Sequence, residues 1–420
     1  MGAFRSSMKK ILIKGPALTR SGYGEQARFA LRSLASRPDL YDLYLMATGW
    51  GKTSWVIEDD AERKWMDHLI NKTASFIQSG GKFDASLQVT IPNEWERIAP
   101  YNVGYTAGIE TTRVAPEWIE KANMMDKIIV VSNHSKNVFE DTTYVLQNEK
   151  QQRVDFKCNT EIDVVNYPVK KYDPVNLELD LPYDFNFFSV AQWGPRKNVK
   201  NTIKWFVEEF HDDEVGLVVK MFQMKNCHMD KLNCMTKLKD LLHEYPDRKC
   251  KVHLIHGNMT DEEMNALYTH PKLKAFASLT HGEGYGLPLF EAAYNGMPIV
   301  APSWSGQCDF LFAPVKKKNS NKTKIRPLFA KVEYDLKPIP KEAVWKGVLQ
   351  PDSMWCYARE SSYKRKLREV YKSHSTFVGQ ANKLKKYLNN NFTEQIMYSN
   401  FVNAMDKSTT AAEDSLVMVV

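Results

Sequence analysis

Short apolar segments recur along the chain, separated by longer segments in which apolar positions follow a helical period. The short segments have strand length and are mostly apolar throughout, which is typical of strands buried on both faces of a parallel sheet. In the first half we predict strands at residues 11–14, 41–47, 85–90, 126–132 and 161–165, and one that begins at Val103. In the second half we predict strands at residues 185–191, 215–221, 252–256, 274–279 and 298–302.

The segments between these strands predict helices. The first helix begins near Glu25, with Ala27, Leu31 and Leu34 on one face. Further helices are predicted at residues 57–72, 199–210, 229–243, 261–268, 289–295, 361–372, 377–388 and 393–405, and one begins at Pro116. The regular alternation of strand and helix predicts an α/β fold with parallel sheets.

The chain has 420 residues, which suits two domains of about 200 residues each. Residues 167–183 contain three prolines and no periodicity, so we interpret them as a linker. We therefore predict a first Rossmann-like domain at 8–166 and a second at 184–390. Residues 391–407 contain a last helix, and we expect the tail, 408–420, to be disordered or weakly held.

Composition adds less than the pattern does. The apolar share of 43% and the charged share of 25% are those of a soluble globular protein. The N-terminus lacks the apolar core of a signal peptide, and no apolar run is long enough to span a membrane. The six cysteines form no C-x-x-C pair, so we expect free thiols and a cytoplasmic protein. The net charge of +7 permits an anionic partner.

The glycine-rich turn at residues 282–286 is the strongest candidate for a binding site. It joins a predicted strand to a helix, and glycines there let the backbone approach a ligand closely. The helix start offers unpaired N–H groups to an anion such as a phosphate. Glu283 lies in the turn and Glu291 on the helix. Because carboxylates accept hydrogen bonds from hydroxyls, this combination suits a ligand with both phosphate and sugar.

The run E-G-Y-G-L-P-L-x-E-A-x-x-x-G-x-P-I-V, which begins at Glu283, resembles the donor-site signature of retaining glycosyltransferases with the GT-B fold, especially family 4. The resemblance implies two Rossmann-like domains that face each other across a cleft, with the C-terminal helix packed back on the first domain. It implies that Glu283 holds sugar hydroxyls and Glu291 the nucleotide ribose. The other donor-binding residues that it implies in this run are Gly284, Tyr285, Gly286 and Leu287.

The same resemblance assigns roles in the second domain outside this run. Arg196 and Lys197, in G-P-R-K-N, match basic residues that pair with the donor diphosphate. A fork-shaped guanidinium and a compact ammonium suit two phosphates. Asn258 and Met259 follow a predicted strand where similar enzymes contact the donor base. The co-substrate would be a nucleotide-diphosphate sugar, and we expect no metal ion or other cofactor.

Two loops of the first domain complete the predicted site. Gly22 and Gly24 follow the first strand, in the loop that in similar enzymes faces the cleft. Glu110 follows the strand that begins at Val103. The carboxyl ends of parallel strands point into the ligand crevice, so we expect Glu110 to contact substrate, directed at the acceptor.

Two acceptors are compatible with the sequence. They are a glycan of the cell envelope and hydroxymethylated bases of phage-type DNA. Residues 314–326 form a basic segment without acidic residues, which we interpret as a surface loop. Lys316, Lys317 and Lys318 are its candidate contacts to a polyanion. The alternatives are an epimerase or phosphorylase on the same fold, or a nucleotide-sugar binding protein without turnover. The sequence predicts no oligomeric state.

Overall fold

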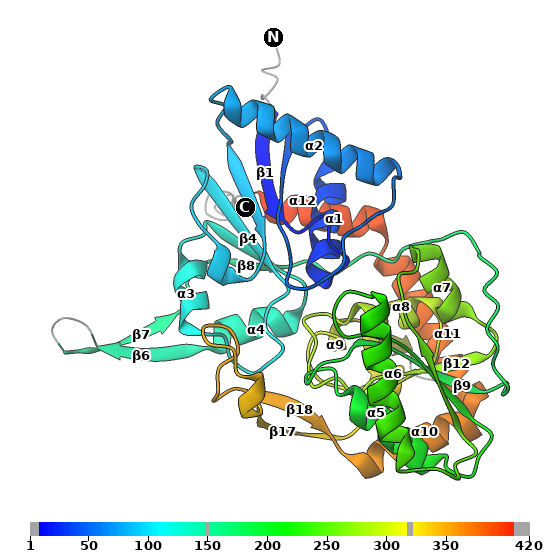
Figure 1. Ribbon diagram of the computed structural model, residues 1–420. Helices are drawn as coiled ribbons and strands as arrows, with labels where there is room; N and C mark the ends of the chain where they lie inside the picture. Colours follow the sequence, from blue (N-terminus) through cyan, green and yellow to red (C-terminus); the bar gives the residue numbers. More distant parts are fainter. Residues whose placement is uncertain (1–7, 148–150, 317–321, 407–420) are drawn as a thin grey trace.

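The computed structural model describes residues 8–147, 151–316 and 322–406. Within them lie two six-stranded sheets, each the centre of one domain (Figure 1). Every strand pair within these two sheets is parallel. The predicted α/β architecture of two Rossmann-like domains is therefore confirmed.

The first sheet has the order β2-β1-β3-β4-β5-β8. Its strands are β1 (Lys9–Gly15), β2 (Tyr41–Ala47), β3 (Ala85–Val89), β4 (Tyr101–Thr106), β5 (Lys127–Val130) and β8 (Ile162–Val164). The helices of this domain are α1 (Gly22–Ala35), α2 (Ala61–Gln78), the short 3-10 helix η1 (Pro92–Glu94), α3 (Pro116–Asn123) and α4 (Asn133–Asp141).

The second sheet has the order β11-β10-β9-β12-β13-β16. Its strands are β9 (Asn186–Gln192), β10 (Gly216–Phe222), β11 (Lys251–Ile255), β12 (Leu273–Ala277), β13 (Ile299–Pro302) and β16 (Ala330–Val332). Phe187 and Phe188 of β9 belong to separate core clusters, because successive residues of a strand point to opposite faces. The sheet is therefore buried on both faces, which explains its nearly continuous apolar strands.

Eight α-helices follow β9 in the described chain, seven of them before the last. These seven are α5 (Val199–Glu209), α6 (His228–His243), α7 (Asp261–Thr269), α8 (Leu287–Asn295), the short α9 (Cys308–Leu311), α10 (Glu360–Lys372) and α11 (His374–Asn391). After them, α12 (Glu394–Met405) ends the described chain. Thr393 caps its start, and the Thr393 side chain accepts a hydrogen bond from the Ile396 N–H.

The last helix packs on the first domain, as predicted. In Figure 1, α12 lies beside α1, although the two are separated by most of the chain. Phe401 is fully buried, and its ring lies 5.5 Å from that of Phe29 on α1 and 5.1 Å from that of Tyr105 on β4. The chain also crosses between the domains at residues 165–185, which form no regular element.

A second connection between the domains was not predicted. β17 (Tyr334–Pro338) and β18 (Met354–Ala358) form an antiparallel pair, with η2 (Lys341–Ala343) in the connection between them. We call residues 334–358 the strap, because its tip reaches the first domain. Asn93 Nδ2 donates to the Gly347 carbonyl at 2.9 Å, and Arg113 pairs with Asp352 at 2.5 Å.

The prediction of a surface loop at residues 314–326 is wrong. Most of it forms an antiparallel hairpin of β14 (Phe312–Lys316) and β15 (Thr323–Pro327). Lys316 is exposed at the end of β14, and Lys317 and Lys318 lie outside the described residues. A further hairpin, β6 (Thr143–Gln147) with β7 (Arg153–Lys157), projects from the first domain (Figure 1). The tail at 408–420 also lies outside the described residues.

Over the described ranges, no helix combines the length and the apolar character that a membrane crossing requires. The six cysteines are all described, and each carries a free thiol.

Candidate active site

Glu283 lies at the centre of a cluster of charged side chains where the two domains meet. Its carboxylate accepts hydrogen bonds from Arg196 Nη1 at 3.1 Å and from Lys197 Nζ at 2.5 Å. Burial alone would raise the pKa of Glu283, but the charges of Lys197 and Arg196 outweigh burial and lower the pKa to about 2. The carboxylate is therefore ionised at neutral pH even though the residue is only 7% exposed.

The topology of the second sheet brings these three residues together. Arg196 and Lys197 lie in the loop after β9, and Glu283 lies in the loop after β12. β9 and β12 are neighbours, and the strand order reverses between them. At such a switch point the loops at the carboxyl ends of the strands open a crevice, which is where open α/β sheets bind ligands.

Glu110 joins the cluster from the first domain. Its Oε1 lies 3.3 Å from Arg196 Nη2, and it follows β4 of the first sheet. Arg196 also donates a hydrogen bond to the Gly282 carbonyl at 2.6 Å. Burial alone would lower the pKa of Arg196, but Glu110 and Glu283 raise it above its usual value. The guanidinium therefore links the two domains through a charged contact.

Two positions of the turn lie so close to the backbone of the first domain that only glycine fits there. A Cβ on Gly284 would lie 2.4 Å from the Ala107 carbonyl oxygen, and one on Gly282 would lie 2.4 Å from that of Glu110. Ser132 Oγ donates to the Gly284 carbonyl at 2.6 Å. The sequence pattern indicated close approach to a ligand, whereas the structure shows close approach between two backbones.

The next three residues of the turn differ in what they expose. The side chain of Tyr285 lies in the core, with its ring 5.0 Å from Tyr167 and 4.9 Å from Phe310. Gly286 has a φ of 95°, a conformation that favours glycine, and it caps α8. Leu287 is the first residue of that helix. The Tyr285 side chain is therefore not available to a ligand in this conformation.

Glu291 has a different environment from Glu283. It lies on α8, about one turn from the start of the helix. Burial raises the pKa of Glu291 to about 7, and nearby Tyr268 and Lys170 offset only part of that effect. At neutral pH the carboxyl group is thus balanced between its protonated and ionised forms.

Gly22 and Gly24 form the first turn of α1 rather than the loop before a helix that starts near Glu25. The helix begins at Gly22, and the Ser21 side chain caps it by accepting from the Gly24 N–H at 2.9 Å. A Cβ on Gly24 would lie 2.0 Å from the Thr19 carbonyl oxygen, whereas Gly22 has no atom within 4 Å of that position. Steric hindrance therefore requires glycine at position 24, whereas Gly22 borders open space.

Asn258 and Met259 lie in the loop after β11, at the carboxyl edge of the second sheet. The Met259 carbonyl accepts a hydrogen bond from Arg20 Nη1 of the first domain at 3.1 Å. The side chain of Asn258 accepts one from Asn226 Nδ2 at 3.2 Å. This loop therefore also faces the other domain.

The sequence reasoning missed two cations beside this loop. Lys220 on β10 donates to the Gly257 carbonyl at 2.6 Å, and burial followed by the charge of Arg20 lowers the pKa of Lys220 to about 8. Arg20 pairs with Glu58. A lysine within the apolar run of β10 was the available signal, because unpaired lysines are rarely buried.

The similarity of this chain to known proteins is seen in its structure and not in its sequence. No protein-family model matches the chain, and neither does any curated protein sequence. A sucrose-phosphate synthase from Thermosynechococcus elongatus is similar over 94% of this chain and 98% of its own, with a TM-score of 0.59 and 11% identity. A glycosyltransferase from Rickettsia africae is similar over 95% and 98%, with a TM-score of 0.58 and 13% identity.

A third similar structure contains ligands. Anabaena Alr3699/HepE, in complex with UDP and glucose, is similar over 94% of this chain and 99% of its own. The TM-score is 0.57 and the identity 12%. At such identities the similarity shows the fold, and the fold of this chain is that of the GT-B glycosyltransferases.

Proposed function

We propose that the protein is a retaining glycosyltransferase that moves a sugar from a nucleoside-diphosphate sugar to a hydroxyl acceptor without a metal ion. The observation that carries this proposal is the cluster of Arg196, Lys197, Glu283 and Glu110 at the switch point of the second sheet. Structures of similar fold in complex with UDP and glucose, or with UDP-glucose, support the proposal.

The two cations would stabilise the departing diphosphate. Charge on that group grows as the glycosidic bond breaks, and fixed cations in a partly buried site stabilise it without reorganisation. In the free protein, Glu283 holds Arg196 and Lys197 in place. With donor bound, the diphosphate would share these cations, and the Glu283 carboxylate would accept hydrogen bonds from sugar hydroxyls.

The remaining carboxylates would orient the two substrates. Glu291 would accept hydrogen bonds from the ribose hydroxyls, and Glu110 would hold the acceptor from the first domain. Retention of configuration follows from a front-face attack in which the leaving phosphate takes the acceptor proton. It follows equally from double displacement with Glu283 as the nucleophile.

We propose a saccharide as the acceptor, in a reducing compartment such as the cytoplasm, where free thiols persist. A second candidate acceptor is DNA with hydroxymethylated bases. The observation that favours it is the β14–β15 hairpin, on which Lys316, Lys324 and Arg326 are exposed.

The test is hydrolysis and transfer with UDP-, GDP- and ADP-sugars, followed by product analysis. Release of nucleoside diphosphate together with a free sugar of unchanged anomeric configuration is expected. Donor binding without release would favour the non-catalytic alternative, and an isomerised sugar would favour an epimerase. Glycosylation of hydroxymethylated DNA in the same assay would establish the second acceptor.

Replacement of Lys197 tests its role in the reaction. Lys197→Ala is expected to lower turnover by about 100-fold, as removal of one stabilising donor does at comparable sites. The dissociation constant of the donor should change by less than about tenfold, because the charge on the diphosphate is largest in the transition state. Kinetics with the preferred nucleotide-sugar and calorimetry of donor binding measure the two effects.

Lys200→Ala is the matched control, because Lys200 is exposed at the start of α5, close to Lys197 in the sequence. It should keep wild-type turnover. Equal losses of turnover and affinity in Lys197→Ala would reduce Lys197 to a ground-state contact, and unchanged turnover would remove it from the site.

A further inference from the structure

A groove outside the charged cluster carries the features of a saccharide-binding site. It has a volume of about 620 Å³ and lies between the base of the strap, the start of α10 and one face of α5. The side chains that line it include Trp205, Asp335, Tyr357, Arg359, Glu360 and Lys364.

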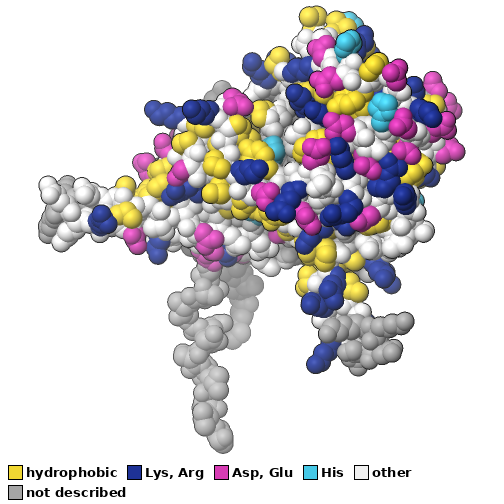
Figure 2. Space-filling view, turned by 90° about the horizontal axis from the view of Figure 1, so that it is seen from below, with side chains coloured by type: hydrophobic (Ala, Val, Ile, Leu, Met, Phe, Trp, Pro, Cys, Tyr) yellow, Lys and Arg dark blue, Asp and Glu magenta, His cyan; other side chains and the backbone are white. Residues whose placement is uncertain are grey.

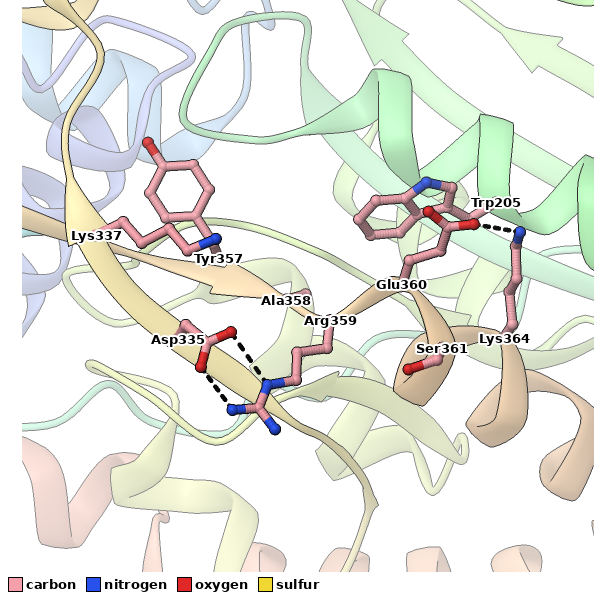
Figure 3. Close-up of a pocket in the computed structure, with 9 residues that line it drawn as sticks. All are labelled: Trp205, Asp335, Lys337, Tyr357, Ala358, Arg359, Glu360, Ser361 and Lys364. Carbon is pink, nitrogen blue, oxygen red and sulfur yellow. Dashed lines mark hydrogen bonds and ion pairs between the residues drawn. The ribbon is translucent and has the colours of Figure 1, made fainter.

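Two aromatic side chains form the ends of the groove. Figure 3 shows Tyr357, from β18, at one end and Trp205, from α5, at the other, with Ala358 and Arg359 between them. Both rings are half-buried, so each is supported by the protein and still presents surface to the groove. Trp205 packs against the buried Tyr363, with 6.2 Å between the ring centroids. Rigid aromatic surfaces of this kind pack against the apolar C–H face of a pyranose.

Between the aromatic ends, four charged groups form two pairs, and a further lining residue, Lys337, has its Nζ 5.9 Å from the centroid of the Tyr357 ring. Arg359 donates to both carboxylate oxygens of Asp335, at 2.6 and 3.1 Å, and Lys364 donates to Glu360 at 2.5 Å. Lys364 also donates to Glu208 at 2.6 Å. Figure 2 shows acidic and basic side chains interspersed over this lower face of the molecule, without a field of one sign. Paired charges offer donors and acceptors side by side, as sugar hydroxyls require, and do not favour an anion.

His281 lies between the groove and the charged cluster. The ring of Tyr357 lies 4.5 Å from that of His281, which is buried two residues before Glu283. The backbone N–H of His281 donates to the Arg196 carbonyl at 2.8 Å. A saccharide bound along the groove would thus have the end that lies on Tyr357 beside the charged cluster.

We propose that this groove binds a neutral oligosaccharide, with sugar rings packed on Trp205 and Tyr357 and hydroxyls bound by the Asp335–Arg359 and Glu360–Lys364 pairs. The bound saccharide is the part of the acceptor away from the reacting hydroxyl. Its identification as the acceptor rests on the proposed glycosyl transfer, whereas the binding of the saccharide does not.

The test is calorimetric titration of the full chain with malto-, cello-, chito- and manno-oligosaccharides. At least one of them should bind saturably, and Trp205→Ala and Asp335→Asn should each raise its dissociation constant by about tenfold or more, an effect typical of central contact residues. Asp335 is 41% exposed, so Asp335→Asn tests the groove even if Trp205→Ala does not fold. Asp39→Asn is the matched control, because Arg37 donates to both oxygens of Asp39 on a distant surface in the same bidentate way.

Salt separates a saccharide from a nucleic acid. Affinity for the saccharide should change by less than about twofold between roughly 0.05 and 0.5 M salt, whereas phosphate contacts would make affinity fall steeply with salt. Failure of every oligosaccharide to bind, equal binding by the groove variants and the wild type, or salt-sensitive binding of duplex DNA that the groove variants abolish would each overturn the proposal.

Donor hydrolysis by the wild-type protein keeps the two proposals apart. Saccharide binding without release of nucleoside diphosphate would uphold the groove and remove its role as an acceptor site. Release of nucleoside diphosphate without saccharide binding would remove the groove and leave the proposed transfer standing.

Discussion

Glu283 and Glu291 belong to one short motif, yet their surroundings change their acidity in opposite directions. Burial raises the pKa of both, but Lys197 and Arg196 overcome it at Glu283 and lower the pKa to about 2. At Glu291 burial prevails, and the pKa rises to about 7. The first carboxylate is charged at neutral pH, whereas the second is about half ionised there.

Glu291 should therefore make stability depend on pH. Its pKa is about 7 in the folded protein, against a reference value of 4.5, so the folded state binds more protons between these two values. Stability then falls as pH rises through this window, by about 1–3 kcal/mol in total. Glu291→Gln should remove this loss. The stability of the variant relative to the wild type should therefore be higher above pH 7 than at pH 5.

Denaturant unfolding at about pH 5 and 8 measures the effect, within the pH range where linkage of this carboxyl group acts. Glu120→Gln, on the exposed side of α3, is the control and should follow the wild type at both values. If Glu291→Gln and the wild type lose the same stability between the two pH values, Glu291 ionises as an ordinary surface carboxyl group.

At the scale of elements, burial decided which ones could be predicted from the sequence. The strands of both sheets are nearly continuous apolar runs because helices cover both faces, and these runs are visible without any structure. The short strand β16 of the second sheet was missed, and so were the hairpins β6–β7, β14–β15 and β17–β18. The hairpin strands carry exposed side chains such as Val145, Ile325 and Leu336, and their pairing depends on the partner strand rather than on an apolar pattern.

The site could be predicted only as far as its residues lie in recognisable loops. Arg196, Lys197 and Glu283 follow strands of one sheet, so the order of elements placed them near the same edge. Arg20 donates to a carbonyl of the other domain, and Lys220 donates to a loop beside its own strand. The first contact depends on how the two domains are placed and the second on which strands are neighbours, and no local pattern records either.

The turn at Gly284 allows a test of the domain contact. Gly284→Ala places a methyl group 2.4 Å from the Ala107 carbonyl oxygen, and both partners are backbone. Because neither can yield without moving a loop, we expect a loss of about 1–3 kcal/mol in unfolding free energy and a loss of transfer activity. Thermal unfolding and donor hydrolysis measure the two effects.

Gly379→Ala is the opposite control. Gly379 is exposed within α11 and has no atom within 4 Å of an added Cβ. This change should stabilise the protein by about 0.5–1 kcal/mol, because alanine favours the helix. A Gly284→Ala variant as stable as the wild type would show that the two loops separate freely.

At the scale of the whole molecule, the strap limits how far the domains can separate. Its tip is bound to the first domain through Asn93 and Arg113. Pro338 and Met354 are paired where β17 and β18 meet the tip, so an Asn-Gly turn can replace residues 339–353. The shortened protein should fold, open more widely and bind donor more weakly.

Distances between spin labels in the two domains report the opening, and far-ultraviolet circular dichroism confirms that the sheets persist. The distance distribution should broaden toward longer values in the shortened protein. An unchanged distribution would mean that the other contacts between the domains hold them in place without the strap.

The packing of α12 also has a consequence for how the protein is made. Phe401 covers Phe29 and Tyr105, which belong to the first domain and are synthesised hundreds of residues earlier. Domains usually fold as they leave the ribosome, from the N-terminus onward. Here the first domain keeps an uncovered apolar surface until α12 has been synthesised. A ribosome that stalls before this helix therefore releases a chain whose first domain presents a ready surface to chaperones and proteases.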